Sequence, residues 1–176
     1  MSLPDATPWF LGNEPGHARA VVADSESMSK IILRARRILT VLGPKIPSDG
    51  TALSVARAIP SASLVASPRT RPLMAAASGV EPDLYMNVLE VMDRLRDEEW
   101  KGFDGKGPYD LVILFGMDYY YASQMFSLMK HFGRGTRTIS LDRHYHPNAG
   151  YSLPNLGPAV WQSEMKKLAG LLRGER

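Results

Sequence analysis

The stretch Leu111-Val-Ile-Leu-Phe-Gly-Met-Asp118 decides the fold. Five consecutive apolar residues closed by a glycine are typical of a strand that is buried on both faces. Asp118 then offers an N-cap for a helix. The apolar residues of that helix recur with helical spacing at Ala122, Met125, Phe126 and Met129. A buried strand that leads directly into a helix indicates one βα unit of a parallel sheet.

Similar units extend from this stretch in both directions along the chain. Further strands are predicted at residues 38–42, 63–66 and 136–141, and helices near residues 24–35, 51–58, 83–97 and 158–173. The alternation predicts a three-layer αβα fold with a mostly parallel sheet, of the Rossmann-like kind, over residues 24–176. Residues 1–23, rich in proline and glycine, are expected to form an extended N-terminal arm.

The carboxyl ends of parallel strands meet at one edge of the sheet, where such folds bind ligands. The residues that follow the predicted strands at this edge are Gly43-Pro44, Ser67-Pro68, Gly116-Met-Asp118 and Asp142-Arg143-His144. One hypothesis is therefore a stand-alone flavin- or nucleotide-binding redox module. Its pyrophosphate pocket would be lined by Gly43, Pro44, Gly116 and Tyr119, and Arg143 would neutralise phosphate charge.

Asp142, His144 and His146 alternate along the chain, so an extended backbone would place all three side chains on one face. With one more ligand they could bind zinc or iron. The chain supplies no cysteine and no second acidic motif for such a site. A polar loop at a strand end is the favoured interpretation, and no metal site is predicted.

The triplet Tyr119-Tyr-Tyr121 begins the helix after the central strand. Side chains fan out by about 100° per residue on a helix, so one apolar stripe cannot bury all three rings. Tyr120 shares its face with polar residues and is expected to be exposed, as an anchor for a partner. Tyr121 shares its face with Met125 and is expected in the core, and Tyr119 should be intermediate.

Composition excludes several classes of protein. The chain has 176 residues, a net charge of +3, 44% hydrophobic residues and no cysteine. It therefore fits one globular domain without disulfides or cysteine-bound clusters. Residues 1–80 hold 9 basic and 5 acidic side chains, residues 81–118 hold 4 and 10, and residues 119–176 hold 8 and 3. Charge zones of alternating sign favour docking to protein over binding to nucleic acid.

The first residues lack the basic start and apolar core of a signal peptide. No apolar run approaches the ~20 residues that a membrane-spanning helix needs. The sequence thus predicts a cytoplasmic protein that does not interact with membranes.

Several segments together resemble one protein family. They are Thr7-Pro-Trp-Phe-Leu-Gly-Asn13, Tyr85-Met-Asn87, the stretch from Asp97 to Ile113, Tyr119-Tyr-Tyr-Ala-Ser-Gln124, Thr138-Ile-Ser-Leu-Asp-Arg-His-Tyr-His-Pro-Asn-Ala149 and Pro154-Asn-Leu156. The chain thereby resembles the epsilon subunit of the archaeal acetyl-CoA decarbonylase/synthase complex, which acts in one-carbon metabolism and methanogenesis. The match is dense over residues 85–156 and thin between 45 and 82.

The resemblance implies a fold like the NAD/FAD-binding domain of deoxyhypusine synthase. It implies a non-catalytic accessory subunit, two copies of which bind two alpha subunits of carbon monoxide dehydrogenase. The nickel–iron–sulfur clusters would belong to the alpha subunit. The accessory subunit would stabilise the assembly and assist electron transfer to FAD. Trp9, Tyr120, Tyr145 and His146 are the residues expected to contact the partner, and self-association is a second kind of contact.

Overall fold

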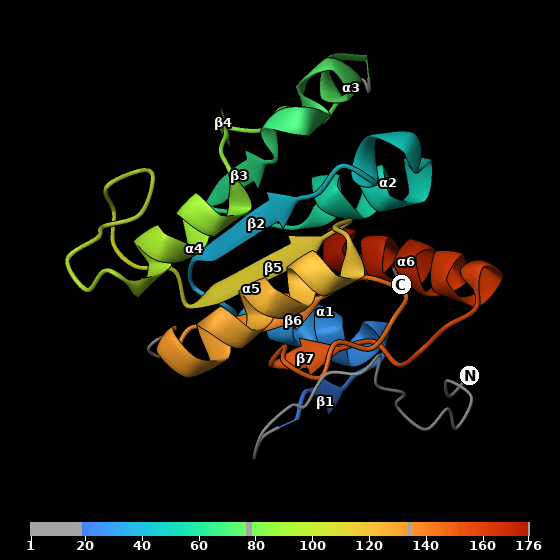
Figure 1. Cartoon of the computed structure of the whole chain (residues 1–176). Coiled ribbons are helices and arrows are strands. Elements are labelled where there is room, and N and C mark those ends of the chain that lie inside the picture. Colours follow the sequence, from blue (N-terminus) through green and yellow to red (C-terminus); the bar gives the residue numbers. More distant parts are fainter. Residues whose placement is uncertain (1–18, 77–78, 134, 176) are drawn as a thin grey trace.

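The structure is a computed structural model that describes residues 19–76, 79–133 and 135–175 (Figure 1). The strands in this part of the chain are β1 (Val21–Val22), β2 (Ile38–Leu42), β3 (Ser63–Ala66), β4 (Leu84–Tyr85), β5 (Leu111–Phe115), β6 (Arg137–Ser140) and β7 (Tyr151–Ser152). They form one sheet in the order β1-β7-β6-β5-β2-β3-β4, and each neighbouring pair is parallel. The predicted α/β class with a parallel sheet is confirmed.

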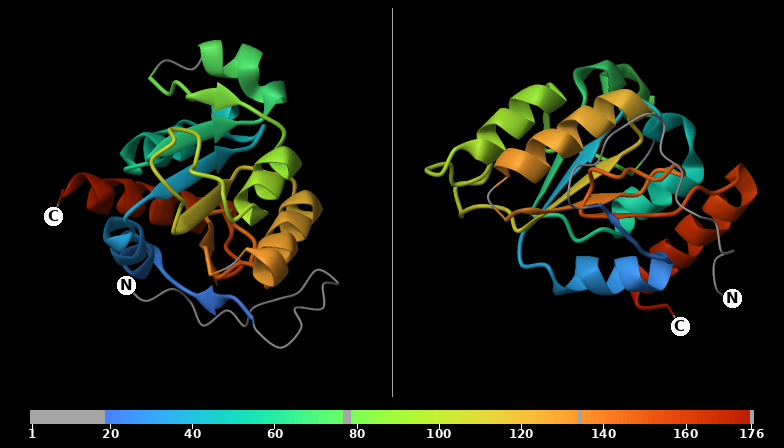
Figure 2. Two further views of the ribbon diagram at one scale, coloured as in Figure 1. Left: turned by 90° about the vertical axis from the view of Figure 1, so that its left-hand side faces the viewer. Right: turned by 60° about the horizontal axis from the view of Figure 1, so that its bottom comes forward.

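Helices lie on both faces of the sheet (Figure 2). One face is covered by α1 (Ser25–Arg34), α2 (Gly50–Ala58) and α6 (Pro158–Arg173), and the other by α4 (Val88–Arg96) and α5 (Tyr119–Phe132). The loop after β2 contains the 3-10 turn η1 (Ile46–Ser48). The loop after β3 contains the turn η2 (Pro68–Thr70) and the short helix α3 (Arg71–Ala76).

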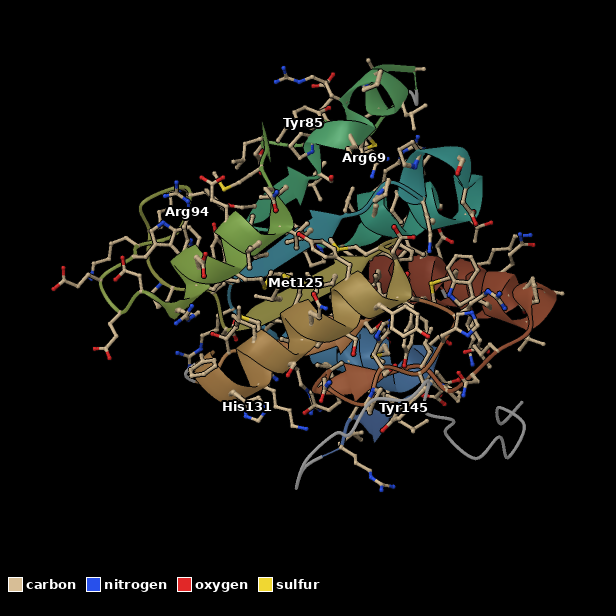
Figure 3. The ribbon with its side chains drawn as sticks, viewed as in Figure 1. Arg69, Tyr85, Arg94, Met125, His131 and Tyr145 are labelled. Carbon is tan, nitrogen blue, oxygen red and sulfur yellow. The ribbon has the colours of Figure 1, made fainter. Side chains whose placement is uncertain are left out.

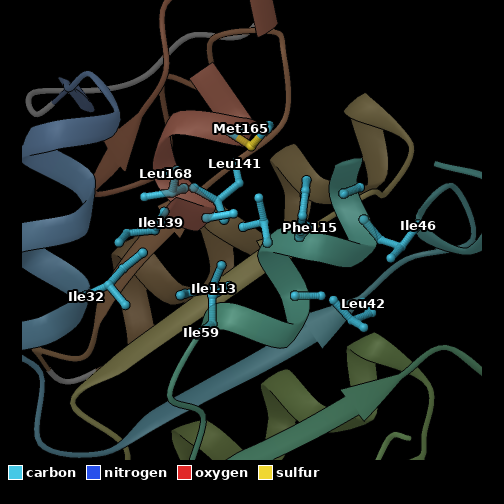
Figure 4. Close-up of a cluster of buried hydrophobic side chains, with 14 of the residues drawn as sticks. Ile32, Leu42, Ile46, Ile59, Ile113, Phe115, Ile139, Leu141, Met165 and Leu168 are labelled. Carbon is cyan, nitrogen blue, oxygen red and sulfur yellow. The ribbon is translucent and has the colours of Figure 1, made fainter. Parts of the chain in front are cut away.

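The central strand β5 separates two hydrophobic clusters. Leu111, Ile113 and Phe115 point toward α1, α2 and α6, in the cluster of Figure 4, whereas Val112 and Leu114 point toward α4 and α5. All five residues are at most 1% exposed. An apolar run without alternation is what a strand covered on both faces requires.

The strand order places a topological switch point at the centre of the sheet. From β2 the chain moves outward to β3 and β4, and it then returns to β5 on the other side of β2 before it reaches β6 and β7. In sheets of this order, ligands bind in the crevice outside the carboxyl ends of the two strands that flank the switch. The candidate site is therefore the region beyond Leu42 and Phe115.

Two segments differ from the sequence-based prediction. The helix expected from Asp83 begins only at Val88, where Asn87 is the N-cap and its Oδ1 accepts a hydrogen bond from the Leu89 amide at 3.0 Å. Leu84 pairs instead with Val65 as strand β4, because the free edge of β3 supplies hydrogen-bond partners. The expected N-terminal arm likewise contributes β1, which pairs with β7.

None of the helices in the described residues combines the length and the hydropathy needed to cross a bilayer.

Candidate functional site

The crevice at the switch point is bridged by the chain itself. After β2 the Gly43 amide donates to Phe115 O at 2.7 Å, and the Lys45 amide donates to Gly116 O at 3.1 Å. The two glycines touch so closely that a Cβ at Gly43 would overlap the Gly116 carbonyl. The Ile46 side chain lies directly against Gly116, which has a φ of +77°. The loop after β2 thus crosses and closes the gap between the ends of β2 and β5, an arrangement that we call the closed crossing.

This bridge leaves two separate cavities at the carboxyl edge. The first, which we call the Asp–His pocket, has a volume of about 260 Å³ and is lined by Lys45, Ile46, Asp49, Ala52, Phe115, Gly116, Met117, Tyr119, Asp142, Arg143, His144, His146 and Trp161. The second, which we call the proline groove, has about 530 Å³ and is lined by Gly43, Pro44, Ser67, Pro68, Arg69, Asn87, Val88, Met117, Asp118 and Tyr121. Arg69, labelled in Figure 3, lies in η2, beyond the end of β3.

The five residues predicted to line one flavin pocket line two different cavities. Gly43 and Pro44 line the proline groove, whereas Gly116, Tyr119 and Arg143 line the Asp–His pocket. The predicted sheet edge is correct, but the packing of Ile46 on Gly116 divides it.

In this class of fold, the backbone amides at the start of the helix bind a pyrophosphate, and at the start of α2 these amides are already occupied. Asp49 is the N-cap, and its Oδ1 accepts hydrogen bonds from the amides of Thr51 at 2.9 Å and Ala52 at 3.1 Å. A carboxylate at this position repels a phosphate and occupies the amides that would bind it. Together with the closed crossing, this geometry does not fit FAD in the usual dinucleotide mode.

Asp142 lies at the floor of the Asp–His pocket, just beyond β6. Its Oδ1 accepts a hydrogen bond from the Gly116 amide at 2.9 Å. Its Oδ2 is buried without a hydrogen-bond partner among the described residues. Burial raises the pKa of this carboxyl to about 6, against the lowering effects of the Gly116 amide and of Lys45.

His146 forms the second polar group at the floor. Its ring is 1% exposed and stacks on Tyr119, with centroids 4.3 Å apart and planes inclined by 20°. Neither ring nitrogen has a hydrogen-bond partner within the described part of the chain. Burial, helped by His144 and Lys45, lowers the pKa of His146 to about 3, so the imidazole is neutral at physiological pH. Its Nε2 lies 3.9 Å from Asp142 Oδ2.

Cationic side chains lie at the mouth of the pocket. Lys45 Nζ donates to Met117 O at 3.1 Å and forms an ion pair with Asp118 at 3.1 Å. Arg143 is exposed. Burial and these two cations lower the pKa of His144. The pocket therefore combines a carboxylate and a neutral imidazole at its floor with positive charge at its rim.

The alternation of Asp142, His144 and His146 does bring all three side chains to one pocket. Within residues 19–76, 79–133 and 135–175, however, no group of three or more histidine or acidic side chains is placed to hold a metal ion.

The predicted contact residues differ in their accessibility. Tyr120 is 63% exposed, as expected. Tyr145 and His146 are 2% and 1% exposed, so their side chains lie inside the fold and not on the surface that the sequence predicts. Tyr145, labelled in Figure 3, donates its hydroxyl to Ala20 O at 2.8 Å, which ties the loop after β6 to the start of β1. Trp9 lies outside the described residues.

The expectation for Tyr121 is wrong. This ring is 37% exposed, and its hydroxyl donates to Asn87 Oδ1 at 3.1 Å. The ring reaches the start of α4 because α4 packs beside α5, an arrangement that the spacing within one helix cannot reveal.

Sequence reasoning missed Lys45 and Trp161 as lining residues. Lys45 directly follows Gly43-Pro44 at the predicted edge, so its position was a usable signal. Trp161 lies in the first turns of α6, and its indole donates to Leu141 O at 2.9 Å. No local pattern connects these two distant segments.

The closed crossing yields a prediction for FAD. Titration of the purified full chain with FAD is expected to give no saturable change in flavin or tryptophan fluorescence in the micromolar range. A flavoprotein stripped of its cofactor serves as the positive control. Flavin that copurifies with the chain, or saturable quenching, would contradict the prediction.

Comparison with known proteins gives a consistent set of matches. The family model for the CO dehydrogenase beta subunit/acetyl-CoA synthase epsilon subunit matches residues 5–169. The acetyl-CoA decarbonylase/synthase complex subunit epsilon of Methanothermobacter thermautotrophicus is 31% identical over 163 residues, 92% of this chain and 93% of the relative. Subunit epsilon 1 of Archaeoglobus fulgidus is 36% identical over 143 residues, 78% of this chain and 75% of the relative. Subunit epsilon 1 of Methanosarcina barkeri is 33% identical over 155 residues, 84% and 86% of the two chains.

Proposed function

The chain belongs to the family of CO dehydrogenase beta subunits and acetyl-CoA synthase epsilon subunits, and from this membership we propose that it is the accessory epsilon subunit of an acetyl-CoA decarbonylase/synthase complex. The observation that carries the proposal is the length of the match, which runs from residue 5 to residue 169. In this role the chain docks on the catalytic alpha subunit of carbon monoxide dehydrogenase and stabilises it without catalysing a reaction itself. We further propose two copies of each subunit in the assembly.

Exposed apolar side chains at the start of α5 support a contact surface there. Tyr120 is the most exposed large hydrophobic side chain among the described residues. Tyr121 beside it and Leu89 at the start of α4 are 37% and 45% exposed. Aromatic residues that protrude in this way are the side chains that most often anchor protein interfaces. Trp9, in the segment before residue 19, remains part of the proposed contact.

The electron-transfer role that the resemblance implies is not part of the proposal. The residues at the carboxyl edge do not fit FAD in the usual mode, because Asp49 occupies the amides at the start of α2 and Ile46 closes the crossing. No step is therefore assigned to a flavin on this chain.

Binding to the alpha subunit of the same organism tests the proposal. The full chain is expected to form a stable complex whose mass, measured by native mass spectrometry, corresponds to two copies of each subunit. Failure of the wild-type chain to bind would overturn the proposed function. A complex of another stoichiometry would overturn only the proposed composition.

The Tyr120→Ala variant tests the contact surface. Its dissociation constant for the alpha subunit is expected to rise at least about tenfold, since truncation of an aromatic anchor commonly costs that much. Phe132→Ala is the matched control, because Phe132 is 58% exposed at the opposite end of the same helix. Equal effects of the two substitutions, measured by biolayer interferometry, would show that the contact lies elsewhere.

A further inference from the structure

The floor of the Asp–His pocket holds three buried polar atoms without hydrogen-bond partners among the described residues. They are Oδ2 of Asp142 and both ring nitrogens of His146. Native proteins leave few such atoms, because a buried polar group without a partner is costly. All three belong to side chains that line one cavity, and the atoms themselves are covered in the empty pocket, so a ligand in the cavity reaches them when the side chains that cover them move aside.

The distance between these groups indicates what they bind together. Asp142 Oδ2 and His146 Nε2 are 3.9 Å apart, too far for a direct hydrogen bond. One oxygen atom placed between them can form a hydrogen bond of ordinary length to each. A hydroxyl group fits best, because it can donate to the carboxylate and accept from the imidazole N–H.

Both groups are held in place before anything binds. Asp142 Oδ1 accepts from the Gly116 amide, which fixes the carboxylate and leaves only Oδ2 for a ligand. The His146 ring is stacked on Tyr119 and also contacts Phe126, with centroids 5.2 Å apart. Rigid partners of this kind lower the cost of binding.

The rest of the pocket indicates more than a single water molecule. Its volume of about 260 Å³ is several times the ~30 Å³ that a water occupies in the liquid. Ile46, Ala52 and Phe115 give it apolar walls, which favour an organic molecule. At the rim, Lys45 and Arg143 add positive charge that an anionic group can face, whereas the Asp49 carboxylate in the same lining is held on the amides of Thr51 and Ala52.

We propose that the Asp–His pocket binds one small hydroxylated organic anion. Its hydroxyl group lies between Asp142 and His146, and its anionic group faces Lys45 and Arg143. A dinucleotide is too large for this pocket and cannot pass the bridge between Gly43 and Gly116. This site goes beyond the proposed docking function and does not depend on it.

Ribose 5-phosphate is a suitable probe, because it carries both groups. Titrated into the 15N-labelled full chain, it is expected to shift the Gly116 amide and the Trp161 indole signals in a saturable manner. Ribose, which lacks the anion, and inorganic phosphate, which lacks the hydroxyl-bearing skeleton, should each bind at least about tenfold more weakly. Equal binding of inorganic phosphate would overturn the recognition of a hydroxyl group, and shifts confined to the proline groove would overturn the site.

Two variants separate the two halves of the site. Asp142→Asn keeps an oxygen for the Gly116 amide but removes the carboxylate. This variant should weaken the binding of ribose 5-phosphate at least about tenfold. Arg143→Gln, at an exposed position where folding is not at risk, should weaken it by a similar factor. Glu90→Gln, an exposed carboxylate on α4 that pairs with Arg94, is the matched control and should change it less than about twofold. Wild-type affinity in both Asp142→Asn and Arg143→Gln would overturn the proposal, whereas association with the alpha subunit is measured separately.

Discussion

Replacing Gly116 by alanine is expected to lower the free energy of unfolding by about 2–5 kcal/mol. A left-handed φ, here +77°, costs an L-residue with a side chain ~1–2 kcal/mol. The added Cβ would lie 2.5 Å from Ile46 Cδ1, and overpacking of this kind typically costs ~1–3 kcal/mol more. Urea unfolding of the two proteins, followed by circular dichroism, measures the difference.

Gly105→Ala is the matched control for this substitution. Gly105 has a similar φ of +71°, but a Cβ there would meet nothing within 4 Å. The free energy of unfolding of this variant is therefore expected to fall by only about 1–2 kcal/mol, the cost of the left-handed backbone conformation alone. If the two variants were equally destabilised, the packing of Ile46 on Gly116 would not close the crossing.

The long strands could be predicted from sequence because burial on both faces leaves a continuous apolar run. The run at Leu111–Phe115 is the clearest case, and Ile38–Leu42 follows the same rule. The two-residue strands carry no such pattern. Val21–Val22 becomes a strand only because Tyr151–Ser152 lies beside it, 129 residues or more further along the chain. Pairing between distant segments decides these elements.

The candidate site, like the strands, could be predicted from the sequence only in part. Strand order alone places the ligand site after β2, β5 and β6. The residues named at that edge do line its two cavities. The division into two cavities depends on Ile46 seated on Gly116, and the neutral state of His146 depends on its burial beside Tyr119. Both are tertiary contacts that no spacing along the chain encodes.

The Asp142→Asn variant is expected to be more stable than the wild type at pH 7.5, by about 1–3 kcal/mol. The folded protein raises the pKa of Asp142 to about 6, above the value of 3.8 expected for the unfolded chain. Between these values the folded state holds a proton that the unfolded state has lost, so this carboxyl makes stability fall as pH rises. Each pKa unit corresponds to ~1.4 kcal/mol of unfolding free energy, and the uncharged side-chain amide of the asparagine avoids this loss.

The histidines of the pocket act in the opposite direction. Burial lowers the pKa values of His146 and His144, so below pH 6.5 the unfolded chain gains protons that the folded chain does not accept. Their contribution makes stability fall as pH falls, and it partly cancels the effect of Asp142 in the wild type. The other titratable side chains that line the pocket are Lys45, Asp49, Tyr119 and Arg143.

Unfolding measured from pH 4 to pH 8 tests this assignment. The advantage of Asp142→Asn should shrink to less than about 1 kcal/mol near pH 4, where the folded wild-type carboxyl is protonated and the unfolded one is partly protonated. Asp110→Asn is the control of opposite sign, because amides of Arg36 and Arg37 and the Arg137 side chain hold the pKa of Asp110 below its usual value. That variant should lose stability at pH 7.5 and regain it in acid. An Asp142→Asn protein that is less stable than the wild type at pH 7.5 would contradict the assignment.

A carboxylate that destabilises the fold at neutral pH is typical of a site shaped for binding. Asp142 keeps one oxygen on the Gly116 amide, and its other oxygen is buried opposite His146 without a partner among the described residues. A ligand hydroxyl would supply that partner and stabilise the charged form. Ribose 5-phosphate should therefore lower the pKa of Asp142 in the complex and reduce the stability advantage of Asp142→Asn at pH 7.5. The stability difference and the ligand site thus have one physical origin, the desolvated Oδ2 at the floor of the pocket.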